Sequence, residues 1–212
     1  ALDAPPGGVD EYYANNYDLL TSSIEADVLY DVRADGTPIY RQQIELENLN
    51  RLLPLQSKGQ VLDYGCGKGA FLGRFLKERP EWNAFGFDVS EKYRSFVERI
   101  IPPSNFVVNS LESLRQRQTK FDLIVMFQVL EHLEKPGETL GILRDLLTEN
   151  GILYVTVPHL LENSIDLFVA DHLSHFTPSA LQLLLQRNGF SQAFTSEIHQ
   201  VGQITAAFRR ER

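Results

Sequence analysis

A short apolar run, a glycine-rich turn and the start of a helix follow one another in this chain, and this succession constrains the fold most strongly. Residues 60–64 are the apolar run, which is typical of a strand buried in a parallel sheet. Gly65, Gly67 and Gly69 allow a tight turn, and residues 70–76 have the apolar spacing of a helix. Such a turn presents free backbone N–H groups at the carboxyl edge of a sheet. The pattern therefore predicts an α/β fold with a ligand site at this turn.

The spacing of the glycines argues against two common nucleotide-binding turns. The turn reads G-x-G-x-G, whereas a dinucleotide site needs G-x-G-x-x-G and a phosphate loop needs G-x-x-x-x-G-K followed by Ser or Thr. Asp63, an acid at the end of the apolar run, would repel a phosphate but suits a ligand with an ammonium or sulfonium group. A glycine-rich turn without a ligand is the alternative.

Three stretches carry a resemblance to a known family. The first motif of class I S-adenosylmethionine-dependent methyltransferases resembles VLDYGCGKG at residues 61–69. The fourth-strand motif of the ubiquinone-biosynthesis-type and related small-molecule methyltransferases resembles FDLIVMFQVLEHLEKP at residues 121–136. Residues 171–190 are similar to the distal region of a subset that includes sugar C-methyltransferases. The resemblance spans about residues 12–208 and implies a Rossmann-like, doubly wound, seven-stranded, mostly parallel sheet with the last strand antiparallel.

The resemblance implies S-adenosyl-L-methionine as the cofactor, lying across the carboxyl ends of the first, second and fourth strands. Asp88, at the end of the second strand, is expected to accept hydrogen bonds from both ribose hydroxyls, with a helix N-cap as its alternative role. Asn109-Ser110 stands where the family usually has Gly-Asp, so a neutral side chain and backbone N–H groups are expected to hold the adenine. The expected cofactor-binding residues are Tyr17, Asp63, Gly65, Cys66, Gly67, Asp88, Val89, Ser110, Leu111, Phe127 and Gln128.

Histidines near the expected acceptor site are the candidates for a general base, because their pKa lies near neutrality. Asp171-His172 aligns with a Glu-His pair that sits beside the substrate in the sugar C-methyltransferases. We expect His172, oriented by Asp171, to be catalytic, and His132 is the second candidate, with packing at a helix end as its alternative role. Tyr13 and His175 are expected to contact the substrate. His172 and His175 have H-x-x-H spacing, but the sequence offers no third ligand, so no metal site is predicted.

The chain has the length of one globular unit. Residues 1–55 are expected to form a helical N-terminal lid segment and a helix packed on the core, and residues 56–212 the cofactor-binding domain. Thr37-Pro38 is expected to open the N-terminal helix, and Ser90 to cap a helix over residues 91–101. Strands are expected at residues 83–88, 121–127 and 152–158, the last after a helix stop at residues 149–151. Tyr12, Tyr13 and Tyr17 suit a lid over the cofactor, and plain packing of aromatic rings is the alternative.

Composition narrows the expected partners and setting. The net charge of −8 disfavours nucleic acid, and no run of about 18 apolar residues predicts a membrane span. The single cysteine and the lack of a visible secretory signal fit a cytoplasmic setting. The expected function is methyl transfer to a small-molecule or sugar-type acceptor. A non-catalytic S-adenosylmethionine-binding scaffold is the alternative, and a NAD-dependent oxidoreductase fits the glycine spacing less well. The sequence leaves open the acceptor atom, the oligomeric state and whether the chain is part of a longer protein.

Overall fold

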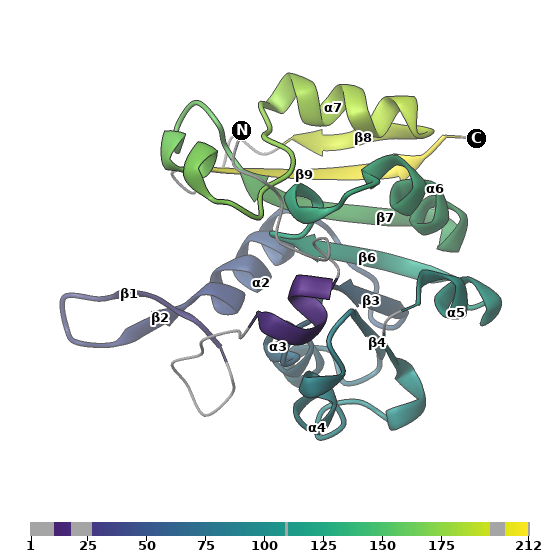
Figure 1. Cartoon of the computed structure of the whole chain (residues 1–212). Helices are drawn as coiled ribbons and strands as arrows, with labels where there is room; N and C mark the ends of the chain where they lie inside the picture. The colour runs from purple at the N-terminus through teal and green to yellow at the C-terminus, as the bar shows by residue number, and fades with distance from the viewer. Residues whose placement is uncertain (1–10, 18–26, 109, 196–201, 212) are drawn as a thin grey trace.

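The computed structural model describes residues 11–17, 27–108, 110–195 and 202–211. A seven-stranded sheet in the order β5-β4-β3-β6-β7-β9-β8 runs through these residues (Figure 1). Its strands are β3 (Gln60–Tyr64), β4 (Asn83–Asp88), β5 (Phe106–Val108), β6 (Phe121–Phe127), β7 (Leu147–Pro158), β8 (Phe190–Thr195) and β9 (Gln203–Arg210). The five strands from β5 to β7 are parallel, and β9 runs antiparallel to both β7 and β8. The predicted doubly wound sheet with an antiparallel last strand is confirmed.

Helices cover both faces of the sheet, which explains why its central strands are nearly continuous apolar runs. In β6 every residue except Asp122 is buried. One core cluster includes residues of α2, α3 and α4, and the other includes residues of α5, α6 and α7. The bounds are α2 (Arg41–Leu52), α3 (Ala70–Glu78), α4 (Arg94–Val97), α5 (Leu111–Gln116), α6 (Pro136–Leu146) and α7 (Pro178–Arg187). Since α2 shares a core with α3, the expected N-terminal helix packs on the domain. No helix within the described ranges is long and apolar enough to cross a membrane.

The winding of the chain leaves a switch point between β3 and β6. Leu62 of β3 pairs with Phe85 of β4 on one side and with Ile124 of β6 on the other. From β3 the chain continues outward through β4 to β5, and it then returns to form β6 and β7 on the opposite side. Ligands of open α/β sheets bind at the carboxyl ends of such diverging strands.

A β-hairpin precedes α2, where a helix was expected to open at Thr37 and Pro38. Its strands β1 (Leu29–Val32) and β2 (Pro38–Tyr40) are antiparallel. Gly36 in the connecting turn has a φ of +85°, and the Asp35 carboxylate accepts a hydrogen bond from the Thr37 N–H at 2.9 Å. Asp-Gly is a strong hairpin signal, and here it prevails over the preference of proline for the first turn of a helix.

The predicted helix over residues 91–101 is only partly formed. A 3-10 helix, Glu91–Tyr93, leads into the four-residue α4. Ser90 was expected to cap this helix, but its side chain makes no capping hydrogen bond. Its hydroxyl instead donates to the carbonyl of Ala14 at 3.3 Å, and so ties the N-terminal segment to the end of β4.

Strand β7 begins earlier than expected, because the Glu149-Asn150-Gly151 stop signal lies inside it. The pairing of β6 with β7 shifts register between Phe121 and Leu123, which accommodates the extra residues. A Cβ atom on Gly151 would lie 2.7 Å from the carbonyl oxygen of Phe121, so the close approach of the two backbones requires glycine here.

Candidate functional site

A cavity of about 960 Å³ lies at the carboxyl ends of β3, β4 and β6, at the switch point. The glycine turn, the N-terminal aromatic residues and the segment after β7 all contribute to its wall. Twelve of the fifteen residues predicted for the site from sequence line it: Tyr13, Tyr17, Gly65, Cys66, Gly67, Asp88, Val89, Leu111, Phe127, Gln128, His132 and His172. The remaining predicted residues, Asp63, Ser110 and His175, do not line it.

The glycine turn closes tightly against its neighbours. Gly65 has a φ of +83°, and a Cβ atom there would lie 2.4 Å from a methyl carbon of Val129. The N–H groups of Gly65 and Cys66 both donate to the carbonyl of Phe87, at 2.8 and 3.0 Å. These bonds fasten the turn to the end of β4. The backbone can therefore approach a ligand more closely than a turn with side chains would allow.

Asp88 joins the glycine turn to the segment that follows β4. Its carboxylate accepts hydrogen bonds from the N–H groups of Gly67 at 2.8 Å and Ser90 at 2.9 Å. Burial raises the pKa of Asp88, and these two N–H donors act in the opposite direction. A carboxylate has about four lone-pair sites, more than these backbone donors and that of Val89 occupy, so Asp88 can still accept from a hydroxyl group in the cavity. The residues present therefore fit a ribose, while the ribose role of Asp88 stays a prediction.

Two residues predicted to bind the cofactor lie outside the cavity wall. Asp63 is buried behind the turn, and both burial and the nearby charge of Asp88 raise its pKa. The hydroxyl of Ser110 accepts a hydrogen bond from the N–H of Ser113 at 3.2 Å and so caps α5, while the adjacent Leu111 lines the cavity. Asn109, the other residue expected near the adenine, lies outside the described residues.

Gln128 follows β6 in a conformation that few side chains adopt. Its φ is +55°, in the left-handed region, and its N–H donates to the carbonyl of Thr156 at 3.0 Å. Its side-chain amide donates to Gln203 of β9 at 3.2 Å. Strained backbone of this kind persists where the surrounding structure holds it, and it is common at ligand sites.

The N-terminal aromatic residues close one side of the cavity. Tyr13 and Tyr17 line it, with ring centroids 4.7 Å apart. The Tyr13 hydroxyl donates to the carboxylate of Asp171 and also contacts Nδ1 of His132, at 2.9 Å. The expected helical lid is thus a short π-helical turn, Tyr12–Asn16, anchored to the wall by one tyrosine.

The orientation of His172 differs from the prediction. Its Nδ1 donates to the carboxylate of Asp166, and Asp171 is engaged by Tyr13 instead. Asp166 is buried, and its second oxygen accepts from Nδ1 of His175 at 2.6 Å. Asp166 was not predicted from the sequence, because it lies six residues before His172 in a short 3-10 helix, Ser164–Phe168, and no periodicity relates the two residues.

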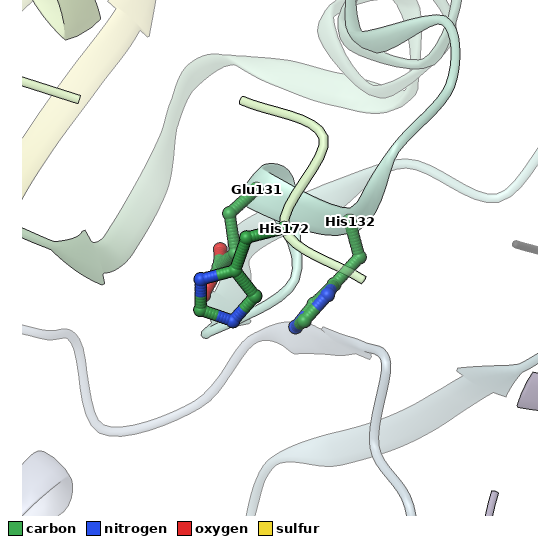
Figure 2. Close-up of side chains that lie close together, drawn as sticks. All are labelled: Glu131, His132 and His172. Carbon is green, nitrogen blue, oxygen red and sulfur yellow. The ribbon is translucent and has the colours of Figure 1, made fainter. Parts of the chain in front are cut away.

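Glu131, His132 and His172 converge at one end of the cavity (Figure 2). Glu131 and His132 belong to a 3-10 helix, Leu130–His132, that follows β6. The N–H groups of Leu173 and Ser174 donate to the backbone carbonyl of Glu131, at 2.8 and 3.0 Å, and hold the loop over this helix. The rings of His132 and His172 meet edge to face, with centroids 4.6 Å apart.

The carboxyl group of Glu131 is the unusual member of this cluster. It is fully buried, and apart from its own backbone N–H neither oxygen has a hydrogen-bond partner among the described residues. Burial, with smaller contributions from the charges of Asp166 and Asp171, raises its pKa to about 8. Burial also lowers the pKa of His132. The cluster therefore places weakly solvated ionisable groups, whose charged forms burial disfavours, against the cavity.

Comparisons with known proteins identify the family. Residues 39–192 match the family described as a methyltransferase domain. The chain is 26% identical over 192 residues to the C-methyltransferase NovU of Streptomyces niveus, covering 83% of this chain and 45% of that protein. It is 28% identical over 145 residues to a tRNA U34 carboxymethyltransferase of Campylobacter jejuni, covering 62% of this chain and 49% of that protein. The chain thus spans about half the length of these relatives.

Structural similarity points to the same fold. An S-adenosylmethionine-dependent methyltransferase from Mesorhizobium loti superposes with a TM-score of 0.64 at 18% identity, covering 78% of this chain and 97% of that one. The matched family, the switch-point cavity and the glycine turn agree with the resemblance found in the sequence. The chain belongs to the methyltransferase-domain family and has the class I fold of the S-adenosyl-L-methionine-dependent methyltransferases.

Proposed function

We propose that this chain transfers the methyl group of S-adenosyl-L-methionine to a small-molecule or sugar-type acceptor, and that His172 removes the acceptor's proton. One observation carries the proposal: a single cavity contains both the glycine turn with Asp88 and the histidines. Binding of the donor and removal of a proton can therefore take place side by side. The relatives act on different acceptors, so the acceptor class rests on the sequence resemblance and on the acidic net charge.

When bound, the cofactor supplies a methyl carbon that its positive sulfur has activated. The tasks left to the chain are alignment, exclusion of water and removal of a proton. The glycine turn and Asp88 hold the donor in place. Tyr13 and Tyr17 cover the cavity, and the hydrogen bond from Tyr13 to Asp171 keeps this cover closed against water.

The hydrogen bonds of His172 suit it to the role of base. Because its Nδ1–H donates to Asp166, its Nε2 carries the lone pair. The proton of the acceptor moves to Nε2, and the Asp166 carboxylate stabilises the imidazolium that forms. His132 is the weaker candidate, since burial lowers its pKa and so disfavours its protonated form.

The test is transfer of an isotopically labelled methyl group from S-adenosylmethionine to a panel of sugars, phenols and carboxylic acids, with tRNA as a separate arm. We expect label in a small molecule and none in tRNA. His172→Ala should lower the rate by about 10²–10⁴-fold. His159→Ala is the matched control, because His159 lies in the same segment but outside the cavity wall.

Three outcomes would contradict the proposal. Label in tRNA alone would assign a nucleic-acid acceptor. Cofactor binding without transfer to any acceptor would favour the scaffold alternative. Tighter binding of NADH than of S-adenosylhomocysteine in titration calorimetry would favour the oxidoreductase alternative.

A further inference from the structure

Glu131, His132 and His172 offer the ligand atoms of a metal site. One ligand atom from each lies within 4.8 Å of the others (Figure 2). They come from two segments that are far apart in the sequence, and the backbone bonds from Leu173 and Ser174 to Glu131 lock these segments together. The H-x-x-H pair considered from sequence is not this set, because His175 points its Nδ1 at Asp166 and does not line the cavity.

The hydrogen bonds of the two histidines prepare one nitrogen of each for coordination. Nδ1 of His172 donates to the Asp166 carboxylate. Nδ1 of His132 lies 2.9 Å from the backbone carbonyl of Asp171, to which it can only donate. The Tyr13 hydroxyl gives its proton to Asp171, so its oxygen can accept from the same Nδ1–H. In this arrangement both Nε2 atoms carry a lone pair, which is how second-shell oxygens orient metal-binding histidines.

Glu131 gives an independent indication of a missing partner. A fully buried carboxyl group with no hydrogen-bond partner beyond its own backbone is costly, and buried charges in proteins are usually paired or bound to metal. Asp166 and Asp171 stand close by, so the surroundings are acidic. The charge of Arg41 favours the ionised form of Glu131, but Arg41 makes no hydrogen bond to it, so a metal ion here would supply the direct partner that the carboxyl group lacks among the described residues.

We propose that Glu131, His132 and His172 bind a divalent metal ion, of which Zn²⁺ fits the two imidazoles and one carboxylate best. Ligands of a tetrahedral zinc lie roughly 3.3–3.5 Å apart at bond lengths of about 2.0–2.1 Å, so binding draws the three side chains together by about an ångström. Three protein ligands leave a fourth position open toward the cavity, and an oxygen of the acceptor would occupy it. In the metal-free chain Nε2 of His172 is available as the base proposed above, and with the ion bound the same nitrogen is a ligand instead.

The experiment measures zinc binding directly, without cofactor or acceptor. The full chain is stripped with a chelator and titrated with Zn²⁺, with Mg²⁺ as a comparison, and Co²⁺ is added in place of zinc to record its visible absorption bands. We expect one zinc per chain, little binding of Mg²⁺, and Co²⁺ bands of a nitrogen- and oxygen-bound site. His172→Ala and Glu131→Gln should abolish this binding, and Asp166→Asn should weaken it about 10–100-fold. His159→Ala should leave it intact.

Thermal unfolding in the absence of metal shows which variants fold, and a variant that fails to fold is replaced by His132→Gln. The proposal is overturned if the stripped chain binds no zinc stoichiometrically, or if zinc binds equally well to His172→Ala and Glu131→Gln. Full methyl transfer by the zinc-free chain would leave the proposed function standing and would overturn the placement of the acceptor on the metal. Zinc binding without any methyl transfer would leave the metal site standing and would contradict the proposed function.

Discussion

At the scale of single residues, Asp166 shows how one buried carboxylate can fix the state of two imidazole rings. Its two oxygens accept from Nδ1 of His172 and of His175, and its side chain is only 1% exposed. Each ring is thereby held in one tautomer. The same bonds keep His172 in place whether its Nε2 receives a proton or binds a metal.

Substitutions of Asp88 that remove one or both of its carboxylate oxygens test its predicted role in cofactor binding. Two charge-assisted hydrogen bonds to ribose contribute about 1.5–3 kcal/mol each at most, so Asp88→Ala should weaken cofactor binding by roughly tenfold or more. The change also removes the acceptors for Gly67 and Ser90, and therefore some loss of stability is expected. Asp88→Asn, which keeps one acceptor oxygen, should have a smaller effect on affinity. Calorimetric dissociation constants together with melting temperatures separate the two effects.

An exposed aspartate in the hairpin provides the control for this series. Asp31→Ala should change neither quantity, because Asp31 lies outside the cavity wall. If Asp88→Ala lowers only the melting temperature, the carboxylate stabilises the glycine turn and does not bind the cofactor.

The sequence predicted the glycine turn well and the end of the cavity that holds the histidines only in part. Gly65 and Gly67 follow from local chemistry, since close backbone approach needs glycine, and the structure places both at the wall. Asp171 was chosen as the partner of His172 because it is adjacent in sequence. The structure gives that place to Asp166, because the path of the chain from the 3-10 helix Ser164–Phe168 to His172 brings the two side chains together, and no sequence pattern sets that path.

At the scale of elements, individual hydrogen bonds attach the N-terminal turn Tyr12–Asn16 to the rest of the domain. The Tyr13 hydroxyl bonds to Asp171, and the carbonyl of Ala14 accepts from Ser90. Tyr13→Phe removes the first of these anchors and keeps the ring. We therefore expect amide hydrogen exchange in residues 11–17 to become about tenfold faster, which corresponds to a decrease of about 1.4 kcal/mol in the free energy of local opening.

Tyr12→Phe is the matched variant, because Tyr12 does not line the cavity. Its exchange rates should stay close to those of the parent chain. Equal protection of the segment in Tyr13→Phe and in the parent would mean that packing of the aromatic rings, and not the hydrogen bond, holds the turn.

Predictability also varies among the elements. Parallel strands buried on both faces stand out as apolar runs, and β4 and β6 have the bounds that the sequence predicted. The hairpin before α2 was missed because its strand β2 is exposed at Pro38 and has no buried face to impose an alternating pattern. Helix α4 is shorter than predicted: it ends at Val97, and residues 98–100 continue as turns.

At the scale of the whole molecule, a chain of polar contacts joins the first long helix to the last strand. Gln203 of β9 donates to the carboxyl group of Glu45 in α2 at 2.9 Å and accepts from Gln128 at the cavity. Glu45 is fully buried, and burial raises its pKa to about 7, with the Gln203 bond acting in the opposite direction.

This raised pKa makes the free energy of unfolding depend on pH. The folded chain holds the Glu45 proton more tightly than the unfolded chain, whose pKa is near 4.5. The resulting stabilisation is therefore complete below pH 4.5 and is lost as the pH rises through about 7. It amounts to roughly 3 kcal/mol at most. Urea unfolding at pH 5 and pH 8 should show a smaller loss of stability for Glu45→Gln than for the parent chain.

Other buried carboxyl groups with raised pKa values, including that of Glu131, act in the same direction in both proteins. The difference between the two chains therefore isolates Glu45. Equal losses in the parent and in Glu45→Gln would show that Glu45 is ionised in the folded chain.

The position of β9 has a consequence for the order in which the sheet can be completed. Strand β8 comes first along the chain, yet its sheet partner is β9, which lies between it and β7. Strand β8 therefore has no hydrogen-bonding partner in the sheet until β9, which follows it in the chain, has paired with β7. The two strands join the sheet as one cooperative step, and an obstacle to either leaves β7 as an open edge available for pairing with other chains.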